Sequence, residues 1–376
     1  MDAVQSEKVR SAAVESGVEE FDTIVVGGGQ AGLAIGRELV RQGRNIIVLD
    51  AHRRVGEAWR SRWDSLRLNT PAKYDGLPGV RFDAPRLSFP SKDAMADYLE
   101  TYVETQGIPV RLATRVERLY REDDRYVAVA GSERFVGRNV VIATGCHEAP
   151  RVPDFAEKLD PSIAQVHSSK YRGPDSLPEG GVLVVGCGNS GAEIARDVST
   201  THETWISGKV PGQLPFRHGP VVAALVFPIV RFAGLHVLTA DTRLGRKAEP
   251  HIRHHSPPLI RTRVPELLAA GVHMVPRTVG TVEGRPELED GASLDVRSVI
   301  WCTGWEENFP WVDLPGFEEG RPAQYRGVVR DHPGLYLLGL EFLYAEGSGT
   351  LPGIGRDARY VAHHIAAKRP VTITGA

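Results

Sequence analysis

Apolar runs typical of strands alternate with helical patterns from residue 21 onward. Two units of strand, helix and strand are expected. The first has strands at 21–26 and 45–50 around a helix that ends near Val40, and the second has strands at 181–185 and 203–207 around a helix that ends near Val198. This alternation is typical of βαβ units on a mostly parallel sheet, so the pattern predicts an α/β fold with two cores.

The remaining segments carry shorter patterns. A helix is expected from about Ser91 to Thr105 with Ser91 as its N-cap, and short strands over 110–136 indicate an antiparallel insert. The stretch 148–178 is rich in Pro, Ser, Gly and Asp, which predicts a linker into the second core. After residue 297 the chain returns to two strands and a helix, expected at 298–302, 334–339 and 354–367.

This C-terminal third is expected to complete the first sheet, which leaves the second core as an insertion. The predicted division is a flexible segment at 1–20, a discontinuous first domain at 21–150 and 296–376, and a second domain at 151–295. The first 20 residues are polar and lack the apolar region of a signal peptide, so they are expected to be poorly ordered.

Composition narrows the class of protein. Of 376 residues, 41% are hydrophobic and 24% are charged, as in ordinary folded chains. The net charge is −2, so no chain-wide positive field attracts nucleic acid. The three cysteines are far apart and form no CxxC pair, which favours a reducing cytoplasm. The apolar stretch 221–238 contains Pro228 and Arg231, so we expect a buried or substrate-lining helix there instead of a membrane span.

A glycine-rich loop follows the first strand of the first unit. Gly27, Gly29 and Gly32 form a GxGxxG sequence between a strand and a helix, where helix N-terminal amides bind a pyrophosphate. The first glycine permits the turn, the second lets the pyrophosphate approach, and the third lets helix pack on strand. Asp50 ends the next strand, where a carboxylate accepts the hydroxyls of an adenosine ribose. Loop and acid together predict FAD at this core.

The second unit has the same kind of loop but no acid after its next strand. Ser207 and Lys209 stand there instead, a hydroxyl and an ammonium suited to a 2′-phosphate, so NADPH is favoured over NADH. An ordinary solvated loop lysine is the alternative for Lys209, and Arg217 is a second candidate. The expected contacts within the loop are Gly186, Gly188, Asn189, Ser190 and Gly191.

Two dinucleotide sites without a CxxC pair imply electron flow from nicotinamide through flavin to an acceptor other than a disulfide, and O₂ is the expected acceptor. The strand ends at 141–145 (VIATG) and 300–304 (IWCTG), with His167 and Tyr171, resemble the flavin-containing monooxygenases, including short bacterial and YUCCA-like members. The resemblance implies two Rossmann-like domains, an FAD domain with an inserted NADPH domain, in a two-dinucleotide-binding-domain flavoprotein. It adds four expected cofactor contacts at these strand ends: Thr144, Gly145, Thr303 and Gly304.

The family's fingerprint before the second loop, FxGxxxHxxx(Y/F), is half present. His167 and Tyr171 match it, whereas Pro161 and Ile163 stand where Phe and Gly are expected. Both matching residues are assigned to the cofactor site, although a histidine that only links the two domains is the favoured interpretation of His167. The motif continues with Arg172 where Baeyer–Villiger relatives have Trp-Pro or Trp-Asp, so ester-forming oxidation of ketones is less expected.

Three segments resemble parts of the family's flavin site. In the first, Trp59 and Arg60 end a sequence similar to GGxWR, which implies that they wrap the ribityl chain and the ring edge. In the second, Asn69 matches an asparagine that faces the reactive flavin carbon, and an ordinary turn before Pro71 is the alternative. An amide there donates a hydrogen bond without supplying an acidic proton. The third is the tail at 339–358, which resembles a flavin-binding run.

The resemblance implies an FAD-dependent NADPH monooxygenase with a small organic molecule and O₂ as substrates. In such enzymes a C4a-hydroperoxyflavin oxygenates a soft nucleophile, an amine nitrogen or a thioether sulfur. Three alternatives stay open: an NADPH-dependent flavin reductase or oxidase that releases hydrogen peroxide, a Baeyer–Villiger monooxygenase, and a sensor that holds flavin only structurally. A homodimer also stays open. The histidines at 251, 254 and 255 lack carboxylates and a regular spacing, so no metal site is expected.

Overall fold

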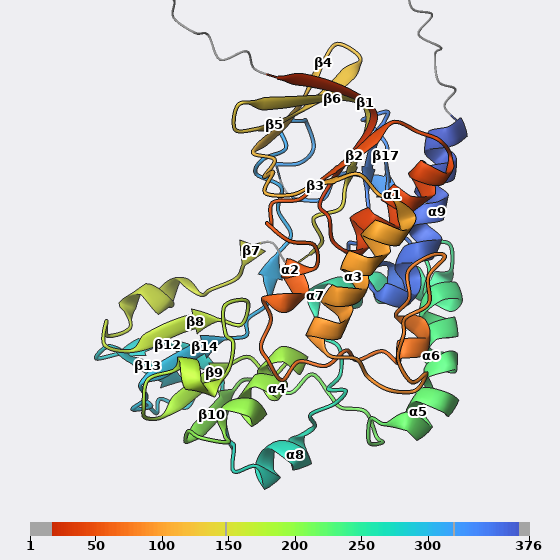
Figure 1. The fold of residues 1–376 in the computed structure, drawn as a ribbon. Coiled ribbons are helices and arrows are strands. Elements are labelled where there is room, and N and C mark those ends of the chain that lie inside the picture. The colour runs from red at the N-terminus through yellow and green to blue at the C-terminus, as the bar shows by residue number, and fades with distance from the viewer. Residues whose placement is uncertain (1–16, 147–148, 319, 368–376) are drawn as a thin grey trace, which may run out of the picture.

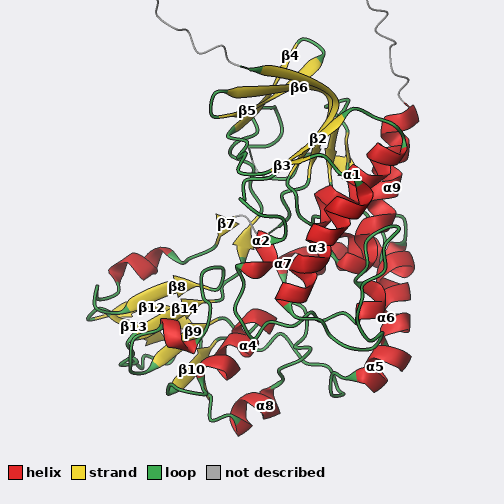
Figure 2. Ribbon diagram, viewed as in Figure 1, coloured by secondary structure: helices red, strands yellow, loops and turns green. Residues whose placement is uncertain are grey.

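Two separate parallel sheets carry the two glycine loops. The computed structural model describes residues 17–146, 149–318 and 320–367 (Figure 1). In Figure 2 the larger sheet lies in the upper part of the molecule and the smaller one at the lower left, with long helices on the right. The expected α/β fold with two cores is confirmed. Most of the predicted flexible segment, residues 1–16, lies outside the described residues.

The nine-stranded sheet belongs to the first unit. Its parallel strands, in spatial order, are β18 (Leu335–Leu337), β6 (Glu133–Ile142), β1 (Val18–Val26), β2 (Ile46–Leu49) and β3 (Val110–Arg111). Its antiparallel additions are β4 (Arg118–Glu122) and β5 (Arg125–Ala130) beside β6, and β16 (Gln324–Tyr325) and β17 (Val328–Val329) beside β18. The antiparallel insert is therefore confirmed for β4 and β5, whereas β3 is a parallel edge strand of the main sheet.

The second sheet has five parallel strands. In spatial order they are β11 (His273–Val275), β10 (Thr204–Ser207), β9 (Val182–Val185), β14 (Ser298–Trp301) and β8 (Ala164–His167). A hairpin of β12 (Thr278–Val282) and β13 (Arg285–Leu288) follows β11 along the chain.

The position of β14 corrects one expectation. The strand at 298–302 was expected to complete the first sheet, but β14 pairs on both sides with strands of the second sheet. β14 is hydrogen-bonded along both edges, to β8 and β9, and its four residues are all buried, as in a central strand of a parallel sheet. A boundary at residue 296 therefore does not separate the two sheets, and we place the return to the first domain after β14.

The two connections between the sheets run side by side. β7 (Ala149–Pro150) on the outgoing segment pairs antiparallel with β15 (Trp305–Glu306) on the returning one. The Arg151 amide also donates to the Gly304 carbonyl at 3.0 Å. Two hydrogen-bonded strands thus form the passage between the domains.

Helices cover the sheets and fix the core. The long helices beside the first sheet are α1 (Gln30–Arg41), α3 (Lys92–Gln106) and α9 (Leu351–Ala367), and their apolar faces share one buried cluster with β1 and β2. The second sheet is covered by α4 (Asn189–Val198) and α8 (Val264–Ala269). The other helical segments are α2 (Glu57–Arg60), η1 (Ala72–Tyr74), η2 (Asp154–Lys158), η3 (Pro174–Ser176), α5 (Pro220–Leu225), α6 (Phe227–Phe232), η4 (Ala233–Val237), α7 (Arg243–His254) and η5 (Glu346–Gly349).

The apolar stretch 221–238 differs from its expectation. It forms α5, α6 and η4, and much of its apolar surface faces solvent instead of being buried, as Val221 at 70% and Ile229 at 69% exposure show. Among the described residues no helix is long and apolar enough to cross a membrane.

The N-cap of α3 gives a first prediction. Ser91 was expected to cap this helix, and its hydroxyl accepts from the Ala94 amide at 3.2 Å. We expect Ser91→Ala to lower the free energy of unfolding by about 1 kcal/mol, because a helix amide loses its acceptor. Urea unfolding measures this loss. Ser91→Thr is the control that keeps a hydroxyl, and equal loss in both variants would contradict the capping role.

Candidate active site

The first glycine loop lies where the central strands of the first sheet end. A Cβ at Gly27, which has φ +108°, would lie 2.6 Å from the Ala143 carbonyl oxygen, and one at Gly32 would lie 1.8 Å from the Gly27 oxygen. Neither position has room for a side chain. A Cβ at Gly29 would meet nothing within 4 Å, and Gly29 has an ordinary φ of −77° at the N-cap of α1. Open space at a helix N-terminus is what a pyrophosphate requires.

Asp50 is fixed beside this loop by three N–H donors. Its Oδ2 accepts from the Gly28 amide at 2.7 Å, and its Oδ1 accepts from the His52 amide at 2.7 Å and from His52 Nδ1 at 2.9 Å. Burial works to raise the pKa of Asp50, but the bonds from His52 and Gly28 outweigh it and hold that pKa below its usual value. The carboxylate is therefore ionised and able to accept ribose hydroxyls.

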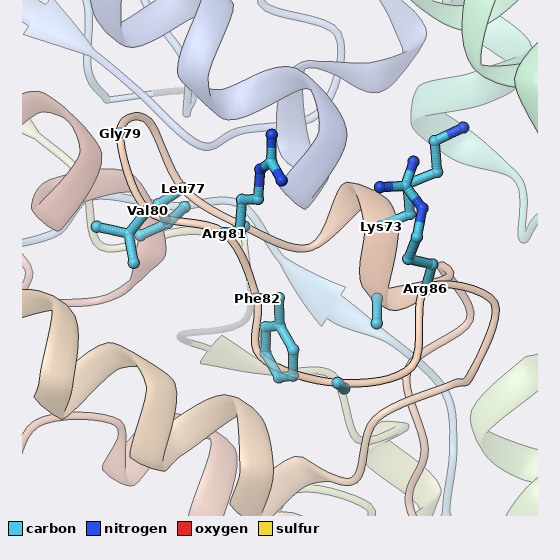
Figure 3. A pocket seen from close by; sticks show the side chains of 10 residues that line it. Lys73, Leu77, Gly79, Val80, Arg81, Phe82 and Arg86 are labelled. Atoms are coloured by element: carbon cyan, nitrogen blue, oxygen red, sulfur yellow. The ribbon is translucent and has the colours of Figure 1, made fainter.

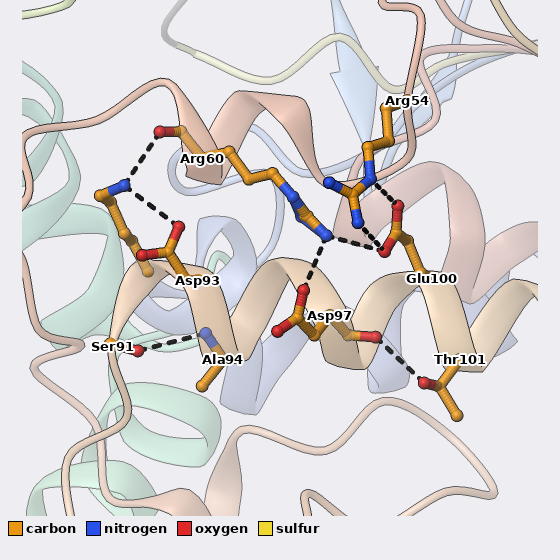
Figure 4. Close-up of polar contacts among 9 residues, drawn as sticks. Arg54, Arg60, Ser91, Asp93, Ala94, Asp97, Glu100 and Thr101 are labelled. Atoms are coloured by element: carbon orange, nitrogen blue, oxygen red, sulfur yellow. Dashed lines mark hydrogen bonds and ion pairs between the residues drawn. The ribbon is translucent and has the colours of Figure 1, made fainter.

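Trp59 and Arg60 are held by neighbouring helices. Trp59 Nε1 donates to Gln30 Oε1 at 2.9 Å, which fixes the indole beside the first residue of α1. Figure 4 shows Arg60 directed toward α3, where its Nη2 contacts Asp97 at 2.8 Å and Glu100 at 2.7 Å. Arg60 Nη1 is buried and has no partner in the described part of the chain, so one donor is left for a ligand.

Asn69 combines a free amide oxygen with an anchored backbone. Its Oδ1 is buried without a partner among the described residues, and its carbonyl accepts from His218 Nε2 at 3.0 Å. The His218 ring packs on Phe89 with the ring centroids 4.0 Å apart. Burial lowers the pKa of His218, so the ring is neutral. Sequence reasoning missed His218, because it lies 149 residues from Asn69 and no local pattern marks it.

Asp75 is buried next to this segment. It has no exposed surface and accepts a hydrogen bond from the Thr70 hydroxyl, whereas its Oδ2 has no partner among the described residues. Burial raises the pKa of Asp75 to about 7, although the Thr70 bond works the other way. A carboxyl of this kind keeps its proton at mildly acidic pH.

Several features of the first unit fit FAD. The Cβ space at Gly29 is open, and the Asp50 carboxylate stands beside it. Asn69 Oδ1 and Thr144 Oγ1 are buried polar atoms without a described partner. Such an atom is costly unless something supplies its hydrogen bond, and a bound ligand does so. Gly145, after Thr144, has φ +81° and turns the chain away from the end of β6.

The second glycine loop repeats the geometry of the first. A Cβ at Gly186 (φ +112°) would lie 2.3 Å from the Cys302 oxygen, and one at Gly191 would lie 1.8 Å from the Gly186 oxygen. A Cβ at Gly188 would lie 3.2 Å from Ser256 Oγ, so this loop is less open than the first. The Asn189 side chain donates to the Pro258 carbonyl and accepts from the Ile260 amide, whereas Ser190 is exposed.

A pocket of about 320 Å³ lies at the start of this loop, and its lining includes Gly186, Ser207 and Lys209 among the expected NADPH residues. Lys209 is exposed at its wall, but the Ser207 hydroxyl already bonds Thr278 Oγ1 at 2.6 Å and accepts from the Thr278 amide at 2.9 Å. Arg277, which sequence reasoning missed, lines the same pocket and is exposed. Lys209 and Arg277 therefore place two exposed cations at the wall of this pocket.

His167 and Tyr171 have structural contacts. His167 Nε2 donates to the Gly304 carbonyl at 3.2 Å and its Nδ1 accepts from the Ser169 amide at 3.2 Å, so both ring nitrogens are used and β8 is tied to the returning connection. The Tyr171 ring is 1% exposed within the second core, and its hydroxyl donates to Asp197 at 2.9 Å. Direct nucleotide contact from either side chain has no support in this geometry.

The segment after β14 also turns at the predicted residues. Gly304 has φ +87°, and the Thr303 hydroxyl donates to the Arg151 carbonyl on the outgoing connection. Thr303 also lines the pocket at the second loop. Within the described ranges no three His, Cys, Asp or Glu side chains gather where they could hold a metal ion.

The comparisons with known proteins agree with this geometry. A family model described as pyridine nucleotide-disulphide oxidoreductase matches residues 24–204. An uncharacterized CzcO-like oxidoreductase of Geobacillus kaustophilus is 35% identical over 92% of this chain and 98% of its own length. Indole-3-pyruvate monooxygenase YUCCA4 of rice is 32% identical over 94% of this chain and 89% of its own length.

A solved flavin-containing monooxygenase from Stenotrophomonas maltophilia has a TM-score of 0.74 and 27% identity, over 93% of this chain and 99% of that chain. The chain belongs to the flavin-containing monooxygenase family. It is an FAD-dependent monooxygenase with the two-dinucleotide-domain fold of that family. The resemblance seen in the strand ends and glycine loops is thereby confirmed.

The two glycines of the first loop give a matched test. We expect Gly29→Ala to fold with unchanged stability in the FAD-free form but to bind FAD more than tenfold more weakly, because the methyl group enters the open pyrophosphate space. We expect Gly32→Ala to lower the unfolding temperature even without FAD, because its Cβ meets the Gly27 oxygen. FAD titration and thermal unfolding separate the two effects, and full FAD affinity in Gly29→Ala would contradict the assignment.

The raised pKa of Asp75 predicts a pH dependence of stability. Between about pH 4 and pH 7 the folded protein keeps a proton that the unfolded chain loses, so this group makes stability fall as pH rises. We expect Asp75→Asn to flatten that fall, measured by urea unfolding at several pH values. Asp83→Asn, at an exposed position in the same loop, is the control. A wild-type pH profile in Asp75→Asn would show that Asp75 does not titrate in this range.

Proposed function

We propose that this chain is an NADPH-dependent flavoprotein monooxygenase that oxygenates a soft nucleophile, an amine nitrogen or a thioether sulfur, of a small organic molecule. The observation that carries the proposal is Asn69, a neutral amide whose backbone carbonyl is held by His218, on a segment that resembles the flavin-facing asparagine of the family. The free cysteines agree with a cytoplasmic location. Arg172 in place of the Baeyer–Villiger tryptophan motif favours heteroatom oxygenation over ester formation.

The proposed division of labour assigns one task to each group of residues. The open loop at Gly29 and the Asp50 carboxylate bind the pyrophosphate and ribose of FAD, and Trp59 lies beside them. Lys209 and Arg277 bind the 2′-phosphate of NADPH. FAD held by these residues would supply the hydride acceptor for NADPH and the reaction with O₂.

Asn69 and His218 control protons at the proposed site. The Asn69 amide offers a hydrogen bond but no acidic proton. The neutral His218 ring donates its Nε2–H to the Asn69 carbonyl. His218 therefore positions the segment that carries Asn69 and does not act as an acid. Neither Asn69 nor His218 therefore offers a mobile proton to the reacting oxygen, which favours transfer to the substrate over release of hydrogen peroxide.

The 2′-phosphate site gives the next prediction. We expect Lys209→Ala and Arg277→Ala each to weaken NADPH binding tenfold to a hundredfold, about 1.5–3 kcal/mol, and to leave NADH binding unchanged. Kinetics with both nucleotides measure the preference. Arg217→Ala is the control, because the Arg217 side chain is 86% exposed and lies near Glu266. An equal loss with NADPH and NADH would mean that the replaced residue is structural.

Asn69 gives the test of oxygen transfer. We expect Asn69→Ala to keep NADPH-driven flavin reduction near the wild-type rate and to divert electrons to hydrogen peroxide, because one preorganised donor, worth about 2.7–4 kcal/mol, is lost. Stopped-flow flavin spectra and peroxide assays measure both steps. Loss of FAD or slow hydride transfer, with peroxide release unchanged, would make Asn69 a turn residue.

A further inference from the structure

The continuous helical stretch of α5, α6 and η4 presents an apolar face to solvent. Four side chains on it are 60–70% exposed: Val221, Leu225, Ile229 and Phe232. Their spacing of four, four and three residues places them on one side of a helix. A surface helix normally has polar residues on its outer side, so this arrangement is inverted.

The opposite side of the same stretch packs against the rest of the protein. Ala223 and Leu235 are buried, and Arg356 of α9 donates to the Leu235 carbonyl at 2.6 Å. The Phe227 ring contacts the Tyr74 ring of η1 with centroids 5.2 Å apart. The stretch is therefore held in place from within, and its outer apolar side chains are a feature of the native surface.

Cations lie beside the helical stretch, around the Tyr74 ring that contacts Phe227. Lys73 is exposed and lies over this ring at 4.9 Å from its centroid, whereas Arg231, at 5.2 Å, has a buried Nε and belongs to the inner side. The Lys73 amide bonds the Arg86 carbonyl at 3.0 Å, and Figure 3 shows both side chains extending to the same side of a pocket of about 520 Å³. In the described part of the chain, no ion pair involves Lys73, Arg86 or Arg231. The one exposed acid of this loop is Asp83.

The charge of the surrounding sequence has the same sign. Residues 203–266, which contain the helical stretch, hold nine Lys and Arg and four acidic residues, whereas the whole chain has a net charge of −2. A local excess of this size attracts an anionic partner over about one Debye length.

We propose that this apolar–basic face, made of Val221, Leu225, Ile229 and Phe232 with the neighbouring exposed Lys73 and Arg86, docks on an anionic lipid surface. The apolar side chains enter the boundary between headgroups and acyl chains, and the cations bind the headgroups. A second copy of the chain would bring a patch of the same charge, whereas an anionic surface offers the opposite charge to Lys73 and Arg86. The docking is peripheral and does not depend on the proposed substrate class.

Co-sedimentation of the holoenzyme with lipid vesicles tests the proposal. We expect binding to vesicles of phosphatidylcholine with phosphatidylglycerol and much less to phosphatidylcholine alone. Leu225→Gln with Ile229→Gln should lower binding more than tenfold, because two exposed apolar groups are lost. Lys73→Gln with Arg86→Gln should lower binding to the anionic vesicles roughly 25-fold, about fivefold for each cation.

Leu268→Gln is the matched control, since Leu268 is 58% exposed on α8, outside this face, and should bind vesicles like the wild type. FAD content and NADPH oxidation, measured without lipid, should be equal in all these variants, which separates this test from the proposed function. Wild-type binding by the Leu225/Ile229 variant would overturn the proposal. A wild-type dimer that this variant converts to a monomer in light scattering would also overturn it and assign the face to self-association.

Discussion

In each nucleotide site, the first turn of a helix packs directly against one carbonyl oxygen, that of the first glycine in the preceding loop. The space between Gly32 and the Gly27 oxygen, and between Gly191 and the Gly186 oxygen, admits no Cβ at all. This contact brings the first turn of α1 or α4 to the end of its strand, where helix amides converge on a small space. The placement of both dinucleotides depends on it, because any side chain there would push the helix away.

In both domains, the end of the neighbouring parallel strand also contacts the first glycine of the loop. The carbonyl at the end of β6 lies against Gly27, and the carbonyl after β14 lies against Gly186. The sequence showed this relation in the two similar strand ends at 141–145 and 300–304. Each of these strand ends must lie next to its own glycine loop, so β14 belongs to the second sheet. The order of the elements along the sequence alone had suggested the first sheet.

Local patterns predicted the glycine loops, Asp50 and the cap of α3, because each depends on residues close in sequence or on one known strand end. Local patterns could not predict contacts between residues that are far apart in sequence. The bond between His218 and the Asn69 carbonyl spans 149 residues, and the Ser207 hydroxyl is taken by Thr278 on a hairpin that no motif connects to it. The outer face of α5 and α6 was misjudged for a related reason, since an apolar run does not reveal which side of a helix finds a neighbour.

The property that defines the proposed monooxygenase is a flavin site that transfers oxygen to a substrate instead of releasing peroxide. The most direct measurement mixes the NADPH-reduced holoenzyme with O₂ in a stopped-flow spectrometer, with NADP⁺ present and with or without a small thioether. We expect a lasting oxygenated flavin spectrum that decays faster when the thioether is added, with one sulfoxide formed per NADPH. Immediate return of the oxidised flavin, with one hydrogen peroxide per NADPH and no sulfoxide, would contradict it.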